Sequence, residues 1–238
     1  MPTFYAVGTG PGNAELLTLK ALRFLKSSEI IFYSESEKNT IALDTLKDLA
    51  GEINLSQKTL VPCRFSMTSD KKKSSDEYEE IAAKCTDYLK SGKNVAMLSI
   101  GDVSLYSSAS RTARLIKDSG FEVKFVAGIN SFSAAANSAA ISLCKKDESL
   151  TVIPADSFLN DGKLESVLKQ DSTKVLMKMG RHLKEIISLL ENMNLIQNST
   201  LIQKASLADE KIFHGKEILS LSVKDFENAY LSLIIVKH

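Results

Sequence analysis

The sequence predicts an α/β protein of two domains, the second with a mixed sheet. Short apolar runs typical of strands alternate with amphipathic helical patterns along the whole chain. This pattern breaks at residues 127–131, Ala-Gly-Ile-Asn-Ser, which places a domain boundary between residues 1–127 and residues 128–238. The final strands follow one another through short connections, which favours antiparallel pairing in the second sheet.

The first domain is expected to contain five strands joined by helices. Asn13 is placed to cap the first helix, and the polar segment 64–75, with its run Lys71-Lys72-Lys73, is expected to be a solvated loop. No aromatic residues are interleaved with these lysines to stack bases, so the run does not indicate a nucleic-acid site. The predicted strands are Phe4–Gly8, Glu29–Tyr33, Leu60–Pro62, Asn94–Ile100 and Glu122–Val126, and the predicted helices cover residues 16–25, 41–49, 76–90 and 105–119.

The second domain is expected to open with an alanine-rich helix, Ser131–Ala140, whose small side chains permit close packing. Helices separate the next strands, and the last strands are consecutive. The predicted strands are Leu150–Ile153, Thr173–Met177, Thr200–Lys204, Lys211–His214 and Tyr230–Val236.

Composition excludes several function classes. Of the 238 residues, 30 are Lys or Arg and 29 are Asp or Glu, so the net charge of +1 provides no basic field for nucleic acid or an anionic membrane. No apolar run approaches the about 20 residues of a membrane span, and no leader is expected. The three cysteines are widely spaced and the three histidines form no cluster. We therefore expect a cytoplasmic protein without a metal site or disulfide frame.

The segment Gly8-Thr9-Gly10-Pro11-Gly12 joins the first strand to the first helix. Its spacing is one residue shorter than the GxGxxG dinucleotide fingerprint. Pro11 has no N–H to donate to a phosphate. The loop therefore suits an uncharged or zwitterionic ligand better than pyrophosphate, and a purely structural tight turn is an equal alternative.

Two further motifs are candidates for ligand binding. A buried strand ends in Gly101-Asp102, at the edge of an open sheet where ligands bind. Asp102 is expected either to cap the following helix or to bind a hydroxyl or ammonium group. Gly128 is followed by Asn130, Ser131 and the alanine helix, which combine small polar groups with a closely packed backbone.

In their order and spacing these motifs resemble the tetrapyrrole methylases. The resemblance covers almost the whole chain and is closest to the precorrin-2 / cobalt-factor II C20-methyltransferases. The segments that carry it are Gly8–Ala21, Phe65-Ser66-Met67-Thr68 with Asp70, Gly101–Ser107, Gly128–Ala136, Val175-Leu176-Met177-Lys178 and Tyr230-Leu231-Ser232-Leu233. The sequence departs from the family where Val103 replaces a proline, where Ala127 and Asn130 stand in Pro-Gly-Ile-Thr-Ser, and at Ile141-Ser142-Leu143.

The resemblance implies a homodimeric enzyme with S-adenosylmethionine in a cleft between two α/β domains. The reaction implied is methylation of C20 of precorrin-2 or cobalt-factor II in cobalamin biosynthesis, with S-adenosylhomocysteine as by-product. The residues implied to bind the cofactor are Pro11, Gly101, Asp102, Leu105, Asn130 and Ser131, with Met177 and Ala205 on the adenosine side. The residues implied to bind the substrate are Arg64, Met67, Tyr106 and Ser107.

The chemistry implied requires no activated nucleophile in the protein. The electron-rich macrocycle attacks the sulfonium methyl, and positioning can lower the barrier by about 7–11 kcal/mol. The sequence does not identify the base that accepts the proton from C20. The substrate carboxylates call for cations, and the candidates are Arg64, Lys71–Lys73, Arg111, Lys178 and Arg181.

Three other functions remain open from the sequence. The nearest is a sibling methylase that acts on uroporphyrinogen III, on another corrin position or on a diphthamide precursor. A nucleotide-linked oxidoreductase is a second, although Pro11 and the short glycine spacing count against it. A non-catalytic S-adenosylmethionine-binding module is a third. Whether the substrate carries cobalt is not decided by the sequence.

Overall fold

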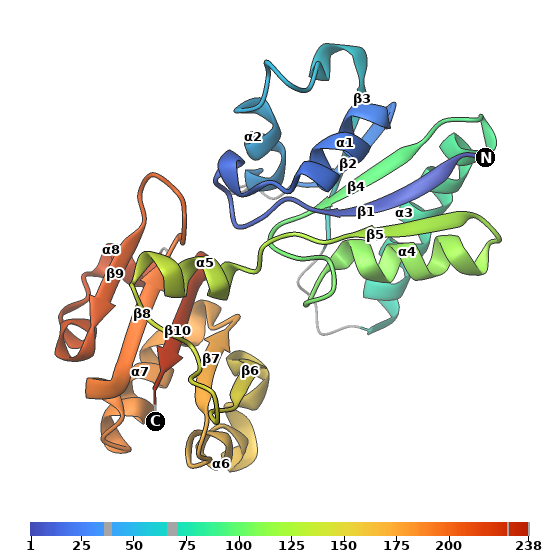
Figure 1. The fold of residues 1–238 in the computed structure, drawn as a ribbon. Coiled ribbons are helices and arrows are strands. Elements are labelled where there is room, and N and C mark those ends of the chain that lie inside the picture. Colours follow the sequence, from blue (N-terminus) through green and yellow to red (C-terminus); the bar gives the residue numbers. More distant parts are fainter. Residues whose placement is uncertain (36–39, 66–70, 228, 238) are drawn as a thin grey trace. The chain divides into compact units, whose positions relative to one another are not determined.

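Two sheets organise the chain, one in each of two units (Figure 1). The computed structural model describes residues 1–35, 40–65, 71–227 and 229–237. The units are Met1–Ser131 and Phe132–His238. The predicted domains, 1–127 and 128–238, remain a prediction, because the division of a structure into units does not show that either part folds alone. No helix in the described ranges is long and apolar enough to cross a membrane.

The sheet of the first unit is entirely parallel, in the order β3-β2-β4-β1-β5. The strand β1, which lies between β4 and β5, is fully buried, and its successive side chains point to opposite faces. Because all five strands are parallel, their carboxyl ends lie at the same edge of the sheet. The strands are β1 (Thr3–Gly8), β2 (Ile30–Ser34), β3 (Thr59–Cys63), β4 (Val95–Ser99) and β5 (Glu122–Val126).

Helices cover both faces of this sheet. Phe4 and Ala6 of β1 pack with one pair of helices, and Tyr5 and Val7 pack with the other. The chain leaves β1 towards α1 on one face and leaves the neighbouring β4 towards α4 on the opposite face. Such a switch in an open α/β sheet creates a crevice at the carboxyl edge, where ligands bind. The first pair is α3 (Lys71–Lys90) and α4 (Ser108–Asp118), and the second is α1 (Leu19–Ser27) and α2 (Ile41–Lys47).

The sheet of the second unit is mixed, as the sequence predicted. Its order is β6-β7-β10-β8-β9, where β6 and β7 are parallel and β10 is antiparallel to both β7 and β8. The strand β9 is antiparallel to β8. The strands β6, β7 and β8 therefore end at the same edge. The strands are β6 (Leu150–Pro154), β7 (Thr173–Met177), β8 (Ser199–Gln203), β9 (Lys211–His214) and β10 (Ser232–Val236).

Helices also cover both faces of the second sheet. The alanines Ala135 and Ala136 of α5 pack against Val175 and Ile202, which confirms close packing of the alanine helix. The opposite face packs against α6 and α7. The helices are α5 (Ser131–Ser138), α6 (Lys163–Leu168), α7 (Leu183–Asn192) and α8 (Val223–Glu227).

The predictions for the start of α3 and for the cap of α1 are wrong. The helix expected to begin at Asp76 begins at Lys71, so Lys71–Lys73 form its first turn instead of a solvated loop. Lysine is a good helix former, and no glycine or proline interrupts the segment. Asn13 caps a short 3₁₀ helix, Ala14–Leu16, and Thr18 caps α1 by accepting from the Ala21 N–H at 3.1 Å. The extended backbone at Leu17 separates the two helices.

Candidate active site

The candidate site is built on the loops that follow β1, β4 and β5 in the first unit. A pair of backbone hydrogen bonds joins the first two loops. The Gly101 N–H donates to the Gly10 carbonyl at 2.7 Å, and the Gly10 N–H donates to the Gly101 carbonyl at 3.2 Å. The Thr9 N–H also donates to the Ser99 carbonyl at 2.8 Å. The loops after β1 and β4 therefore form one rigid unit at the switch point.

Glycine is required where the three loops meet. A Cβ on Gly128 would lie 2.2 Å from the Gly101 carbonyl oxygen and 2.9 Å from backbone atoms of Gly8. A Cβ on Gly8 would lie 2.7 Å from the Gly101 oxygen and from the Gly128 nitrogen. Gly10 and Gly101 have φ of 76° and 74°, in the left-handed region that favours glycine. The glycines thus let three backbones touch at the carboxyl edge of the sheet.

The Asp102 carboxylate ties the loop after β4 to the loop after β5. Its Oδ2 accepts from the Gly128 N–H at 2.8 Å, and its Oδ1 accepts from the Ser104 N–H at 2.8 Å and from the Ser104 hydroxyl. Burial raises the pKa of the Asp102 carboxyl, but hydrogen bonds from Ser104, Gly128 and Val103 outweigh burial and hold the pKa below its ordinary value of 3.8. Asp102 is therefore an anion at neutral pH.

The first of the two roles predicted for Asp102, capping of the following helix, is wrong. That helix, α4, begins at Ser108 instead of Leu105, and the Ser107 hydroxyl caps it by accepting from the Ala109 N–H at 3.1 Å. Tyr106 has a left-handed φ of 51°, which keeps the preceding residues out of the helix. The Asp102 carboxylate instead accepts hydrogen bonds from both loops and joins them.

Two threonines that the sequence analysis did not select also hold the loops. The Thr45 hydroxyl on α2 donates to the Gly12 carbonyl at 3.1 Å, and the Thr18 hydroxyl donates to the Ala127 carbonyl at 3.2 Å. Both contacts join segments far apart in the sequence. No local pattern could have indicated them.

The predicted cofactor residues fall into two groups. Six lie on the three joined loops of the first unit, where Pro11 and Gly101 are buried and Leu105, Asn130 and Ser131 are partly exposed. Met177 ends β7, and Ala205 follows β8, at the shared carboxyl edge of the second sheet. At that edge Lys178 and Lys204 adopt left-handed φ angles of 53° and 54°, a conformation that is common at functional sites.

The predicted substrate residues are less uniform. Tyr106 is 42% exposed beside the joined loops. The Ser107 hydroxyl serves as the cap of α4. Arg64 donates to Glu35 Oε2 from Nε at 3.2 Å and from Nη2 at 3.1 Å, so this cation already has a carboxylate partner. Met67 lies outside the described residues.

The remaining predicted cations lie on several elements. Lys72 and Lys73 are exposed in the first turn of α3, and Arg111 is exposed on α4. Lys178 directly follows β7. Arg181 lies in the 3₁₀ helix Gly180–His182, where its Nε is 3.4 Å from His182 Nε2.

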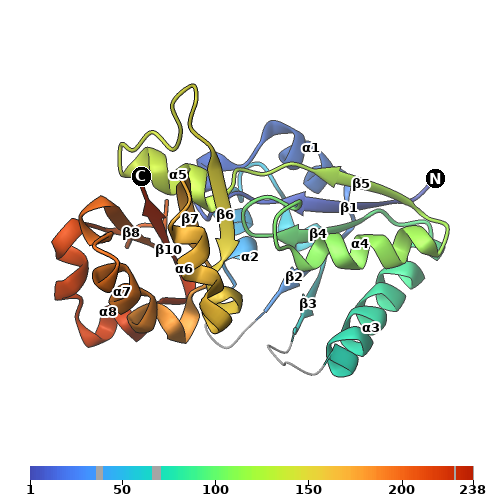
Figure 2. The same cartoon turned by 90° about the horizontal axis from the view of Figure 1, so that it is seen from below.

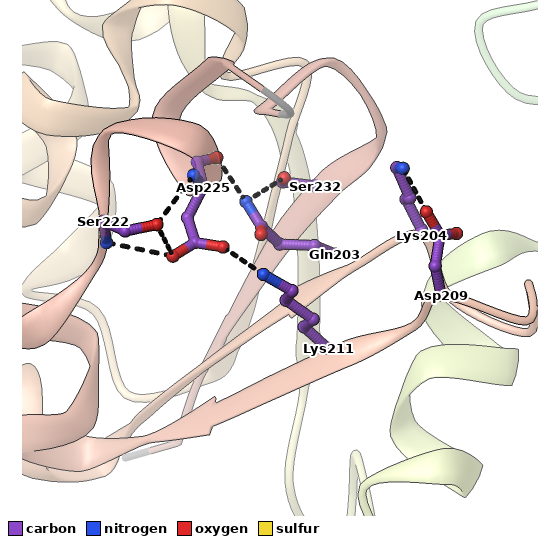
Figure 3. Close-up of polar contacts among 7 residues, drawn as sticks. All are labelled: Gln203, Lys204, Asp209, Lys211, Ser222, Asp225 and Ser232. Atoms are coloured by element: carbon purple, nitrogen blue, oxygen red, sulfur yellow. Dashed lines mark hydrogen bonds and ion pairs between the residues drawn. The ribbon is translucent and has the colours of Figure 1, made fainter.

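A buried polar network supports the carboxyl end of β8 (Figure 3). The Gln203 amide donates to the Asp225 carbonyl at 2.8 Å and to the Ser232 hydroxyl at 3.1 Å. The Asp225 carboxylate accepts from Lys211 Nζ at 2.6 Å and from the Ser222 N–H at 2.9 Å. The hydrogen bond from Lys211, followed by those from Ser222, lowers the pKa of Asp225 to about 2. This network fixes the strand that ends beside Lys204.

We expect Asp225→Asn to lower the free energy of unfolding at pH 7 by about 2 kcal/mol, because a charge-assisted hydrogen bond is lost and an amide NH₂ faces a donor. The pKa of Asp225 is lower in the folded chain than in the unfolded chain. The carboxylate therefore stabilises the fold above about pH 4, and this stabilisation disappears as the pH falls towards 2. Urea unfolding at several pH values should show the difference shrink on acidification. The exposed Asp147→Asn is the control, and an equal loss there would contradict the assignment.

The arrangement of the three loops suits binding and positioning more than acid–base chemistry. Residues 8–12, 100–107 and 127–131 contain no Cys, His or Lys. A Cβ at Gly101 would lie 3.8 Å from the Ser131 nitrogen and 3.9 Å from the Ile129 oxygen, so the bare Cα faces the polar backbone of the third loop. Backbone donors and acceptors with one nearby carboxylate match a small ligand that combines ammonium, carboxylate and hydroxyl groups.

Comparison with known proteins identifies the family. Residues 3–217 match the model of the Tetrapyrrole (Corrin/Porphyrin) Methylases. A Methanocaldococcus jannaschii protein named "probable cobalt-precorrin-2 C(20)-methyltransferase" is 35% identical, over 98% of this chain and 95% of that protein. The cobalt-precorrin-2 C(20)-methyltransferase of Salmonella typhimurium is 30% identical, over 78% of this chain and 76% of that protein.

Solved structures show the same fold. The cobalt precorrin-4 methyltransferase structure has a TM-score of 0.74 at 20% identity, and the match covers 99% of this chain and 94% of that one. The uroporphyrin-III C-methyltransferase of Thermus thermophilus, in complex with S-adenosylhomocysteine, has a TM-score of 0.65 at 17% identity, over 100% and 98% of the two chains. With the three joined glycine loops and the family match over most of its length, this chain belongs to the tetrapyrrole (corrin/porphyrin) methylase family.

Proposed function

We propose that this protein transfers a methyl group from S-adenosylmethionine to C20 of a precorrin-2-type tetrapyrrole in cobalamin biosynthesis. The observation that carries the proposal is the 35% identity, over nearly the full length of both chains, to the protein named "probable cobalt-precorrin-2 C(20)-methyltransferase". A second relative with the same activity in its name is 30% identical. Because both names specify cobalt-precorrin-2, we propose the cobalt-containing form as the substrate.

The loop cluster of the first unit fits S-adenosylmethionine. The cofactor supplies an electrophilic methyl group on its sulfonium. We propose that Gly101, Asn130 and Ser131 bind its amino-acid part through their backbone and polar groups, with Pro11 and Leu105 providing apolar contacts. Asp102 supplies negative charge near the cationic cofactor and fixes the Gly128 loop. Contacts of Met177 and Ala205 with the adenosine part remain predictions.

Catalysis on this proposal is mainly positioning. The three loops would bind the cofactor that supplies the methyl group, and their backbone hydrogen bonds limit the entropy still to be lost. Arg64, Met67, Tyr106 and Ser107 are proposed to line the substrate side. In the structure the Ser107 hydroxyl caps α4, and Arg64 forms an ion pair with Glu35. Substrate binding by these two residues is therefore proposed to occur alongside these contacts. We further propose a cytoplasmic homodimer.

The test is anaerobic incubation of the purified protein with S-adenosylmethionine and, separately, cobalt-precorrin-2, precorrin-2 and uroporphyrinogen III. We expect a gain of one methyl group on cobalt-precorrin-2, mapped to C20 by nuclear magnetic resonance. Methylation of precorrin-2 alone would place the protein in the cobalt-free route. Methylation of uroporphyrinogen III alone, or cofactor binding without any transfer, would refute the C20 assignment.

A further inference from the structure

One cation near the candidate site is held in a fixed orientation. The guanidinium carbon of Arg111 on α4 lies 4.2 Å from the centroid of the Tyr78 ring on α3. Tyr78 is fixed in turn: its ring packs on Phe65 at 4.9 Å between centroids, and its hydroxyl is hydrogen-bonded to the Ser108 hydroxyl at 3.1 Å. This is a cation–π contact with the ring face, and a guanidinium carries its N–H donors along its edges.

Arg111 differs from Arg64 in its polar contacts. It makes no ion pair to any carboxylate in the described part of the chain, and its polar contact there is a 3.4 Å hydrogen bond from Nη1 to the Ser74 hydroxyl. Arg64, by contrast, is paired with Glu35. The first turn of α4 contains no acidic residue, and a cation in a first turn is disfavoured by the helix dipole. Helix stability therefore does not explain the position of Arg111.

The position connects Arg111 to the methylation site. Both α3 and α4 begin at the carboxyl edge of the first sheet and run side by side (Figure 1, Figure 2). Ser74 and Tyr78 lie within the first two turns of α3, and Arg111 lies in the first turn of α4. Ser108, which is bonded to Tyr78, directly follows the loop that contains Gly101, Asp102 and Tyr106.

We propose that Arg111, oriented by Tyr78, binds a peripheral carboxylate of the tetrapyrrole substrate. The proposal rests on the proposed function for the identity of the ligand. Tetrapyrrole precursors carry acetate and propionate groups around the ring, and a guanidinium held over an aromatic ring keeps paired N–H donors that suit a carboxylate. Tyr78 is a positioning residue, because it acts through Arg111.

The test measures binding of uroporphyrin III, a stable fluorescent polycarboxylate, to wild type and Arg111→Gln. We expect the dissociation constant to rise about 10- to 100-fold, with the affinity for S-adenosylmethionine unchanged. Arg114→Gln, which removes an exposed cation from the next turn of α4, is the matched control. Equal binding by wild type and Arg111→Gln, an equal loss in Arg114→Gln, or no binding by wild type would each overturn the proposal.

Two further measurements test whether Tyr78 orients Arg111 and whether the carboxylate site stands independently of the proposed function. Tyr78→Leu should weaken probe binding, and Tyr78→Phe, which keeps the stacked ring, should restore most of it; no difference between them would remove Tyr78 from the proposal. With cobalt-precorrin-2, Arg111→Gln should raise KM more than it lowers kcat. If the wild type methylates no tetrapyrrole, the proposed function fails, while loss of probe binding in Arg111→Gln alone would still support the carboxylate site.

Discussion

We expect Gly128→Ala to abolish cofactor binding and to destabilise the first unit severely. The added methyl would lie 2.2 Å from the Gly101 carbonyl oxygen and 2.9 Å from Gly8, and all of these are backbone atoms. A flexible side chain could move away, but two strand ends held by the Gly10–Gly101 hydrogen bonds cannot do so cheaply. Overpacking typically costs about 1–3 kcal/mol and occasionally more, and we expect the upper end here because the added methyl meets only backbone atoms.

The measurement is urea unfolding together with calorimetric titration of S-adenosylmethionine. The control is Gly51→Ala, where the added methyl meets nothing within 4 Å and the backbone is not left-handed. Its unfolding free energy should stay within about 0.5 kcal/mol of wild type. If Gly128→Ala is as stable as Gly51→Ala and binds the cofactor normally, the loops do not meet as described.

A milder variant keeps this test informative if Gly128→Ala does not fold. Gly101→Ala places its methyl 3.8 Å from the Ser131 nitrogen, so there is space, and the cost comes from the left-handed φ of 74°. That strain is about 1–2 kcal/mol. The folded variant should bind S-adenosylmethionine at least tenfold more weakly, because the methyl covers the backbone that faces the third loop. Normal affinity would mean that the cofactor does not approach Gly101.

Most of the fold could be predicted because its signals are local. Alternating apolar runs identified the strands of both sheets, and the short connections near the C-terminus indicated the mixed sheet that the structure confirms. The predicted first residues of the helices were less accurate than the strands. Side-chain caps determine where a helix begins, and Asn13 and Thr18, only five positions apart, are both good cap residues. Sequence pattern alone could not tell which of the two begins α1.

The candidate site was predictable only in part. The glycine motifs marked where the chain turns, but the contact of Gly128 with Gly8 and Gly101 depends on strand order, which brings residue 128 beside residue 8. The same holds for Thr45, whose hydroxyl reaches Gly12 from another helix. Asp102 illustrates the limit best. Its sequence position suits a helix cap, and the structure instead uses its carboxylate to join two loops.

We expect Asp102→Ala to lower kcat/KM for methyl transfer about 100-fold or more, mainly through weaker binding of S-adenosylmethionine. The substitution leaves the partly buried Gly128 N–H without its acceptor, at a cost of about 1–3 kcal/mol, and it also removes the acceptor of the exposed Ser104 N–H. Asp102→Asn should also lose much of the activity, since its amide can present an acceptor to one of these N–H groups but not to both. Ser104→Ala, which removes only the hydroxyl contact, should lose less than tenfold.

The pH dependence distinguishes loop organisation from proton transfer. Hydrogen bonds from Ser104, Gly128 and Val103 overcome the effect of burial and lower the pKa of Asp102 in the folded chain. The carboxylate therefore stabilises the loops above about pH 4 and stops doing so as the pH falls through its folded pKa. A carboxylate whose pKa is held below its ordinary value is a weak base at neutral pH.

Because Asp102 stays ionised between pH 5 and 8, its titration should not change the affinity for the cofactor in this range. The pH–rate profile of Asp102→Asn should have the same shape as that of the wild type, with lower rates throughout. Calorimetric titration of S-adenosylmethionine across this range, combined with kcat measured at saturating cofactor, separates the two roles. A large fall in kcat with unchanged cofactor affinity, together with loss of an acidic limb from the profile, would instead identify Asp102 as the group that accepts the proton from C20.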